Sequence, residues 1–172
     1  AAHNTAVGFT ALEQTTTGVF NVACGSQALN ANTTASNNNA FGYSALLSNT
    51  TGTHNNAFGT LALDVNTTGQ QNVGMGSNAL GANTTASNNV GIGHEALKAN
   101  TTGDLNTAVG ALSLDACTTG ASNTAVGKDA LTDNSTGTNN VAMGENALAN
   151  NTTADQNTAL GQNAMLTNST GG

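Results

Sequence analysis

The chain has 172 residues, of which 37% are hydrophobic and only 6% are charged, and it lacks proline and tryptophan. Its net charge is −7 and its only basic residues besides histidine are two lysines, so a nucleic-acid partner is not expected, because little in the chain can neutralise phosphates. No apolar run approaches the roughly 20 residues that a membrane-spanning helix needs, so membrane insertion is not expected either.

A 17-residue unit recurs ten times along the whole chain. Such a short, regular period predicts one coil of a solenoid per repeat. We therefore expect a single all-β repeat domain over residues 1–172, folded as a parallel β-solenoid (β-helix or β-roll) of about ten coils. Helical repeats fit poorly, because 17 residues with two glycine-type corners cannot hold two ordinary helices. Disorder fits poorly, because the same two positions of the unit are apolar in every copy. The repeats start at Asn4, Asn21, Asn38, Asn55, Asn72, Asn89, Asn106, Asn123, Asn140 and Asn157.

Written from its first asparagine, the unit reads N-x-[AG]-Φ-G-x-x-A-L-x-x-N-T-T-[GA]-x-x, where Φ is apolar, and its positions are numbered 1 to 17 below. Two short strands per coil are expected, at positions 2–4 and 12–14. The two apolar columns, at positions 4 and 9, are predicted to form the core, and their varied sizes suit a stacked interior. The predicted core residues are Val7, Leu12, Leu29, Phe41, Leu46, Phe58, Leu63, Met75, Leu80, Ile92, Leu97, Val109, Leu114, Val126, Leu131, Met143, Leu148 and Leu160.

Two corners of the unit differ in what they accept. Position 5 is glycine in every copy, which predicts a positive φ there. Position 15 is glycine in most copies but accepts Ala35, Ala86 and Ala154, so a left-handed conformation is not expected at that corner. Small residues at positions 3 and 8 indicate that another backbone approaches closely, either the opposite wall of the coil or a neighbouring chain.

Asparagine at position 12 and threonine at position 14 are expected to stack into hydrogen-bonded ladders along the solenoid. Eight of these asparagines also begin N-[TS]-T triplets, which are formal N-glycosylation acceptors. Adjacent acceptors would lie only ~4.8 Å apart, so the ladder interpretation is favoured, while modification of some rungs stays open. The acceptors are Asn32, Asn49, Asn66, Asn83, Asn100, Asn134, Asn151 and Asn168.

No constellation of residues predicts catalysis, a cofactor or a metal site. Cys24, at position 4, is predicted to be a small core residue, and Cys117, at position 12, is expected to be more exposed. They lie five coils apart, roughly 24 Å at the strand spacing, too far for an intrachain disulfide. The histidines fall in different coils without ligand spacing, and the acids occupy different variable positions. We therefore expect a protein that is not an enzyme.

The first and last coils carry apolar residues and no obvious polar cap. An open coil is an unpaired β edge, so these residues are predicted to join chains head to tail into a filament. They are Phe9, Val19 and Phe20 in the first repeat and Met165 and Leu166 in the last.

The strings N-T-A-V-G, as in Asn4–Gly8, and A-L-x-x-N-T-T-G, as in Ala62–Gly69, resemble a tandem repeat of bacterial surface proteins and phage tail-fibre proteins. The N-x-A-Φ-G part is also similar to the head repeats of trimeric autotransporter adhesins, which form left-handed β-rolls. The resemblance covers the whole chain and implies an extracellular or cell- or virion-surface location.

The sequence thus predicts a structural subunit of an extracellular fibre that assembles with itself, as a head-to-tail polymer or a homotrimer. The alternatives are an adhesin-like, receptor-binding trimeric shaft, with surface glycans as partners, and an ice-binding protein. The last rests on the threonines, since their regular array resembles the faces of repeat-type ice-binding proteins.

Overall fold

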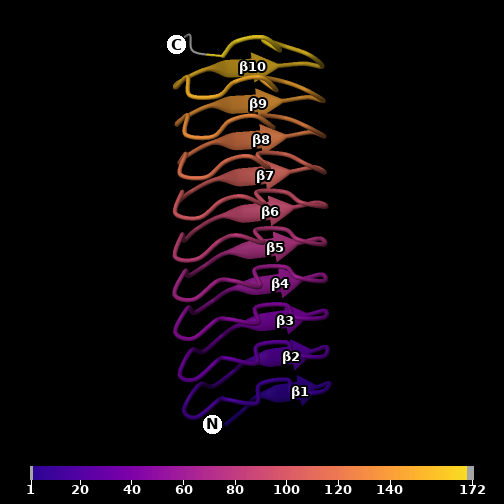
Figure 1. Cartoon of the computed structure of the whole chain (residues 1–172), viewed down its shortest axis with the longest axis vertical. Helices are drawn as coiled ribbons and strands as arrows, with labels where there is room; N and C mark the ends of the chain where they lie inside the picture. Colours follow the sequence, from indigo (N-terminus) through magenta and orange to yellow (C-terminus); the bar gives the residue numbers. More distant parts are fainter. Residues whose placement is uncertain (1, 170–172) are drawn as a thin grey trace.

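The computed structural model describes residues 2–169 and shows a parallel β-solenoid in which each 17-residue repeat forms one coil (Figure 1). Each coil contributes one three-residue strand, and strands that follow one another in sequence pair in parallel into a single ten-stranded sheet. The described residues contain no helix. The all-β solenoid prediction is therefore confirmed. The strands are β1 (Thr5–Val7), β2 (Val22–Cys24), β3 (Asn39–Phe41), β4 (Asn56–Phe58), β5 (Val73–Met75), β6 (Val90–Ile92), β7 (Thr107–Val109), β8 (Thr124–Val126), β9 (Val141–Met143) and β10 (Thr158–Leu160).

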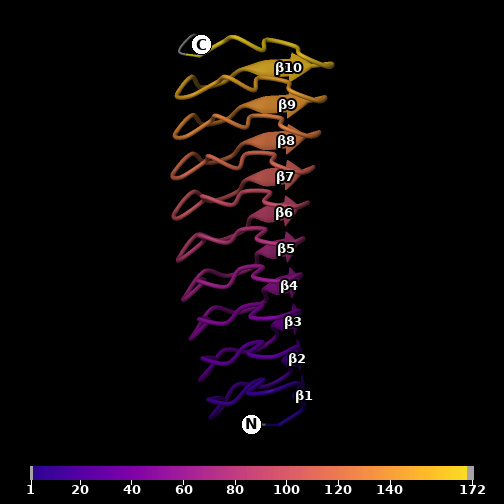
Figure 2. The ribbon, with the colours of Figure 1, turned by 45° about the vertical axis from the view of Figure 1, so that its right-hand side comes forward.

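The register advances by one whole repeat at every step of the sheet, so identical positions lie side by side. Ala40 of β3 pairs with Ala57 of β4, and Phe41 pairs with Phe58. Figure 2 shows that successive strands are slightly offset, so the stack twists gently along its length. Every position of the repeat unit therefore becomes a column that runs along the solenoid.

The strand predicted at positions 12–14 is wrong, whereas the strand at positions 2–4 is confirmed. In the N-T-T segment one carbonyl of the next coil accepts from two successive amides: the Thr67 carbonyl receives the N–H groups of Thr50 (3.0 Å) and Thr51 (3.2 Å). Regular ladder pairing gives each amide its own carbonyl. The shared acceptor turns this wall of the coil into a bend.

The corner at position 5 has the positive φ that its invariant glycine predicts, between 121° and 144° in all ten copies. Position 15 has no positive φ in the described residues, which confirms the contrast between the two corners. Glycines at both corners nevertheless have too little space for a Cβ atom. A Cβ added to Gly76 would lie 2.3 Å from the carbonyl oxygen of Gly93, and one added to Gly69 would lie 2.3 Å from that of Ala86.

The core is a single column of leucines at position 9, enclosed by small residues, mostly alanine, at positions 3 and 8. From Leu29 to Leu148 every leucine of this column is fully buried, which confirms that half of the predicted core. Only in the last described coil is the residue at this position, Met165, exposed (43%). The sheet lies so close to the column that a Cβ at Gly74 would already lie 3.3 Å from Cδ1 of Leu63. Position 3 therefore accepts only alanine or glycine.

The other half of the predicted core, the apolar residues at position 4, is wrong. Neighbouring residues of a strand point to opposite faces, and because the alanine or glycine at position 3 points inward, positions 2 and 4 point outward. Val109 and Val126 are half-buried and the other position-4 residues are exposed. The exposed ones are Val7, Cys24, Phe41, Phe58, Met75, Ile92, Met143 and Leu160.

Two asparagine ladders hold the coils closed and stacked. At position 1, Asn72 donates to the Ala86 carbonyl across its own coil (2.8 Å), while its Oδ1 accepts from the backbone N–H of Asn89 in the next coil (3.0 Å). At position 12, Asn66 donates to Oδ1 of Asn49 (2.9 Å) and to the Gly69 carbonyl (3.1 Å). Both columns are buried, which explains why asparagine recurs there: its side chain supplies a donor and an acceptor at once.

Both cysteine predictions are wrong. Cys24 belongs to the outward-facing position 4 and is exposed, whereas Cys117 replaces an asparagine of the second ladder and is buried. The Cys117 thiol donates to the Gly120 carbonyl (Sγ–O 3.5 Å), and burial raises its pKa to about 11. It cannot complete the ladder, and Oδ1 of Asn100 in the preceding coil is left buried without a partner.

Candidate functional site

The outer face of the ten-stranded sheet carries a continuous ridge of apolar side chains, which we call the apolar column. Between coils 3 and 9 five of its members expose roughly two-fifths of their surface, for example Phe41 (38%), Met75 (41%) and Met143 (43%), while Val109 and Val126 are half-buried. The rings of Phe41 and Phe58 stack on each other with their centroids 4.8 Å apart and their planes within 6°. From coil 1 to coil 10 the column consists of Val7, Cys24, Phe41, Phe58, Met75, Ile92, Val109, Val126, Met143 and Leu160.

A second outward-facing column runs beside it at position 2, and we call it the flanking column. It contains only valine, threonine and asparagine, and from β2 to β9 its members are half-buried. Asn39 donates to Oδ1 of Asn56 (2.8 Å), so the amides of two neighbouring coils are paired. Neither column contains a charged residue. The flanking column consists of Thr5, Val22, Asn39, Asn56, Val73, Val90, Thr107, Thr124, Val141 and Thr158.

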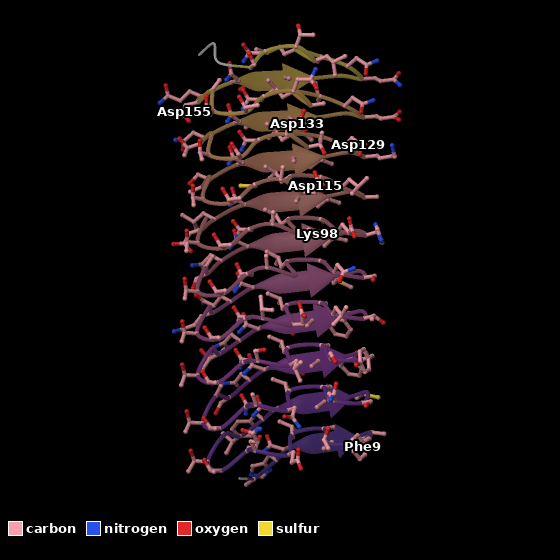
Figure 3. The ribbon with its side chains drawn as sticks, viewed as in Figure 1. Phe9, Lys98, Asp115, Asp129, Asp133 and Asp155 are labelled. Carbon is pink, nitrogen blue, oxygen red and sulfur yellow. The ribbon has the colours of Figure 1, made fainter. Side chains whose placement is uncertain are left out.

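None of the described strands contains a charged residue, and the charges are concentrated in the C-terminal half of the stack, where the acids labelled in Figure 3 lie. Glu95 forms an ion pair with Lys98 (3.0 Å), and Asp129 pairs with Lys128. Burial raises the pKa of the Asp115 carboxyl. Coils 6–10 contain seven of the nine acids and both lysines, and therefore carry a net charge of −5, against −2 for coils 1–5.

The threonines divide between two roles. Those at position 13 use their hydroxyl groups within the stack, as Thr67 does by donating to the Thr84 carbonyl (3.1 Å). Those at position 14 form an exposed threonine column whose hydroxyls make no hydrogen bond to other described residues. Its members are Thr17, Thr34, Thr51, Thr68, Thr85, Thr102, Thr119, Thr136 and Thr153, and Thr170 lies outside the described residues.

Seven of the eight formal glycosylation acceptors are fully buried in the second asparagine ladder. Their amide nitrogens donate within the stack, as Asn83 does to Oδ1 of Asn66 (2.8 Å) and to the Ala86 carbonyl (3.1 Å). A glycan on these nitrogens is incompatible with the folded coil. The eighth acceptor, Asn168, is half-buried in the last coil, and nothing in the structure tests its modification.

A shallow open notch lies at position 10, where Gly81 has no side chain. It is bordered by Asp64 and Lys98, with Val65, Asn78 and Ala82 completing its lining. Lys98 is already paired with Glu95, and burial raises the pKa of Asp64. No cysteine or histidine lines the notch. Nowhere among residues 2–169 do three or more histidine, cysteine, aspartate or glutamate side chains come together as they would around a metal ion.

The residues predicted to join chain ends lie in the first and last described coils. Phe9 (75%) and Phe20 (56%) are exposed, and Phe20 stacks on His3 with a centroid distance of 5.2 Å. Val19 and Leu166 are half-buried, and Met165 is exposed. The sheet edges at β1 and β10 are each paired on one side only. End-to-end association through these residues remains a prediction.

Comparison with models of known protein families, with curated proteins and with solved structures gives no match. Across the described part of the chain, no helix has the length and apolar character needed to cross a membrane. The residues of the apolar column stand out in the repeat, but the repeat predicts them in the interior. The signal that could have placed them outside is the alanine or glycine at position 3, because only one of two neighbouring strand residues can face the core.

Proposed function

We propose that this protein is a structural subunit of an extracellular fibre, a stiff shaft that associates with further copies through its apolar column. The observation that carries the proposal is the position of this column: ten consecutive coils each place one apolar side chain on the outer face of the same sheet. Isolated apolar residues are normal on a surface, but a contiguous patch of this kind marks an interaction site.

The length and regularity of the column support a lateral contact along the whole shaft. Nine steps of ~4.8 Å give a ridge of roughly 43 Å. A partner that covers it must be equally long and present side chains at the same spacing. A second copy of the same solenoid meets both conditions, and burial of the exposed area stabilises the contact by ~25 cal/mol per Å².

The internal ladders support the stiffness that a shaft requires. Asn55, for example, donates to the Gly69 carbonyl (2.8 Å) and accepts from the N–H of Asn72 (3.0 Å), so each coil is tied to itself and to the next. These bonds are buried, where water does not compete for them. The chain therefore has few means of bending between coils.

The test is the mass of the protein in solution. Wild-type protein should sediment as an oligomer of its 16.8 kDa chain, and Met75→Lys should shift it toward the monomer, because the new charge must be desolvated in the interface. The matched control is Thr85→Lys, which adds the same charge in the same coil on the exposed threonine column. It should leave the mass unchanged. A wild-type protein that stays monomeric at high concentration contradicts the proposal.

The threonine column supports a second candidate function, binding of ice. It presents a methyl and a hydroxyl group that are not used within the described stack, once per coil and without interruption from Thr17 to Thr153. The column is only one threonine wide, because the hydroxyls at position 13 are used within the stack. Thermal hysteresis that disappears in Thr68→Lys and Thr85→Lys, but not in Met75→Lys, would favour this function over the fibre.

A further inference from the structure

We propose that the partner of the apolar column is a second copy packed face to face and antiparallel, about a two-fold axis that runs along the strand direction between β5 and β6. This inference rests on the proposed self-association and adds the orientation and register of the partner. Rotation about the strand direction reverses the solenoid axis but keeps the strands parallel. Each column then faces its own copy, and β5 faces β6 of the partner, β4 faces β7, and so on to β1 and β10.

The sizes of the residues in the apolar column are complementary under this operation. The two bulky rings of Phe41 and Phe58, which stack as one block, fall opposite the short side chains of the eighth and seventh coils. The smallest member, Cys24, falls opposite a long methionine. Since well-packed interfaces keep the volume between facing positions nearly constant, this alternation of large and small fits an antiparallel partner. The facing pairs are Val7 with Leu160, Cys24 with Met143, Phe41 with Val126, Phe58 with Val109, and Met75 with Ile92.

The flanking column is matched in polarity by the same operation. At every level a polar residue meets a polar one and a valine meets a valine, so no polar group is buried against an apolar one. The amides of Asn39 and Asn56, already paired with each other, meet threonine hydroxyls that can accept from or donate to them. The facing pairs are Thr5 with Thr158, Val22 with Val141, Asn39 with Thr124, Asn56 with Thr107, and Val73 with Val90.

The distribution of charge favours the same orientation. Coils 6–10 carry a net charge of −5 and coils 1–5 carry −2. A parallel pair would place the two acidic halves beside each other, whereas an antiparallel pair places each acidic half beside the nearly neutral one. The charges lie off the sheet and are screened over about 8 Å at physiological salt, so they bias the orientation, while the two columns supply the contact.

A parallel arrangement lacks these matches. In a parallel pair of facing sheets, the two-fold axis runs along the solenoid and the strands of the two sheets run in opposite directions. Position 2 then falls opposite position 4, so the amide of Asn39 meets the ring of Phe41. Three parallel chains around a common axis place three copies of Phe41 in one layer and three copies of Cys24 in the layer before it. Overpacked and underpacked layers would then alternate.

The native Cys24 thiol is a direct reporter of orientation. In the antiparallel pair two copies of Cys24 are seven coils apart, roughly 34 Å, whereas Cys24 faces Met143 of the other chain. Diamide oxidises two facing thiols to one disulfide and takes up their two protons and two electrons. We therefore expect the wild type to give no covalent dimer and Met143→Cys to give a dimer joined by two disulfides. The double variant Cys24→Ser/Met143→Cys is the matched control and should give none.

Sedimentation of the same samples separates failure of the orientation from failure of the proposed function. A monomeric wild type overturns both. An oligomer in which wild-type Cys24 crosslinks to itself overturns only the antiparallel arrangement and supports a parallel one. An oligomer in which Met143→Cys keeps its circular dichroism spectrum and mass but forms no disulfide also overturns the antiparallel arrangement.

Discussion

At the scale of single residues, the buried leucines show how burial outweighs backbone strain. Leu80 has a φ of 54° and is fully buried, and every other leucine of its column has the same left-handed conformation. That conformation costs roughly 1–2 kcal/mol, while full burial of a leucine gains roughly 1.5–3 kcal/mol. The conformation is retained because it turns inward the one large apolar side chain that is fully buried in each coil from Leu29 to Leu148.

Substitution of this leucine should therefore be costly. Alanine at Leu80 keeps the left-handed strain but removes the burial and leaves a cavity, so Leu80→Ala should lower the free energy of unfolding by ~2–5 kcal/mol. The control Lys98→Ala removes an exposed ion pair with Glu95 and should change it by less than ~1 kcal/mol. Urea denaturation followed by circular dichroism measures both. Equal tolerance of the two changes would contradict the assignment of the leucine column to the core.

Repair of the second asparagine ladder should stabilise the protein. In Cys117→Asn the new amide can donate to the unpartnered Oδ1 of Asn100 and accept from the amide of Asn134, as Asn100 donates to Asn83 and Asn151 donates to Asn134 in the same ladder. Relief of one buried unsatisfied acceptor is worth ~1–3 kcal/mol. We expect a higher midpoint of urea denaturation, and a lower one for the reciprocal change Asn83→Cys. A destabilised Cys117→Asn would show that the pocket around the thiol is too small for the amide.

At the scale of one coil, the closure depends on two asparagines and one glycine. The conformation of Gly76 is predictable from the sequence, because a position that never accepts alanine indicates a φ that alanine does not adopt. The left-handed conformation of Leu80 and Asn78 is not, because leucine rarely has that conformation and neighbouring copies replace Asn78 freely. Those angles are imposed by the closure of a 17-residue coil around its leucine, which is a property of the whole coil.

The first asparagine ladder should be the most sensitive polar feature of a coil. Asn72→Ala leaves the N–H of Asn89 without its side-chain acceptor and removes one of the two side-chain donors to the Ala86 carbonyl, and all three residues are buried. We expect a loss of at least ~2 kcal/mol in the free energy of unfolding, against a change within about 0.5 kcal/mol for the exposed neighbour Gln70→Ala. Hydrogen exchange should show faster exchange at the Asn89 amide. An unchanged exchange rate would contradict the role of this ladder.

The two corners should differ in their tolerance of alanine. A Cβ at either Gly76 or Gly69 would lie 2.3 Å from a carbonyl oxygen of the next coil. Ala35 and Ala86 show that the corner at position 15 can shift to accommodate the methyl group, whereas position 5 adds the strain of a φ of 136° at Gly76, worth roughly 1–3 kcal/mol. Gly76→Ala should therefore lower the melting temperature more than Gly69→Ala. Equal decreases in melting temperature for the two variants, measured by calorimetry, would show that the positive φ at Gly76 adds no strain.

At the scale of the whole molecule, the period of 17 was enough to predict the parallel solenoid and to place the leucine column in its core, although a second core column was predicted beside it. The period could not show which apolar column faces outward. Val109 and Leu114 recur with equal regularity, and a pattern of recurrence is the same for a core and for an interface. The difference lies in the width of the coil, which has room for one large side chain per level, and that width is set by the contact of the position-3 alanines with the leucines.

A thin core that leaves ten apolar side chains outside should make the stability of the shaft depend on protein concentration. If the apolar column is buried between copies, folding is linked to association, and the melting temperature should rise with protein concentration in the wild type and in Thr85→Lys. In Met75→Lys it should stay constant, because the charged side chain weakens the lateral contact. End-to-end association also produces a concentration dependence, but Phe20→Asp or Leu166→Lys would then abolish it while Met75→Lys would not. Calorimetry of these variants over a hundredfold range of concentration thus identifies the surface that stabilises the fibre, and a melting temperature that is constant in the wild type would contradict both modes of assembly.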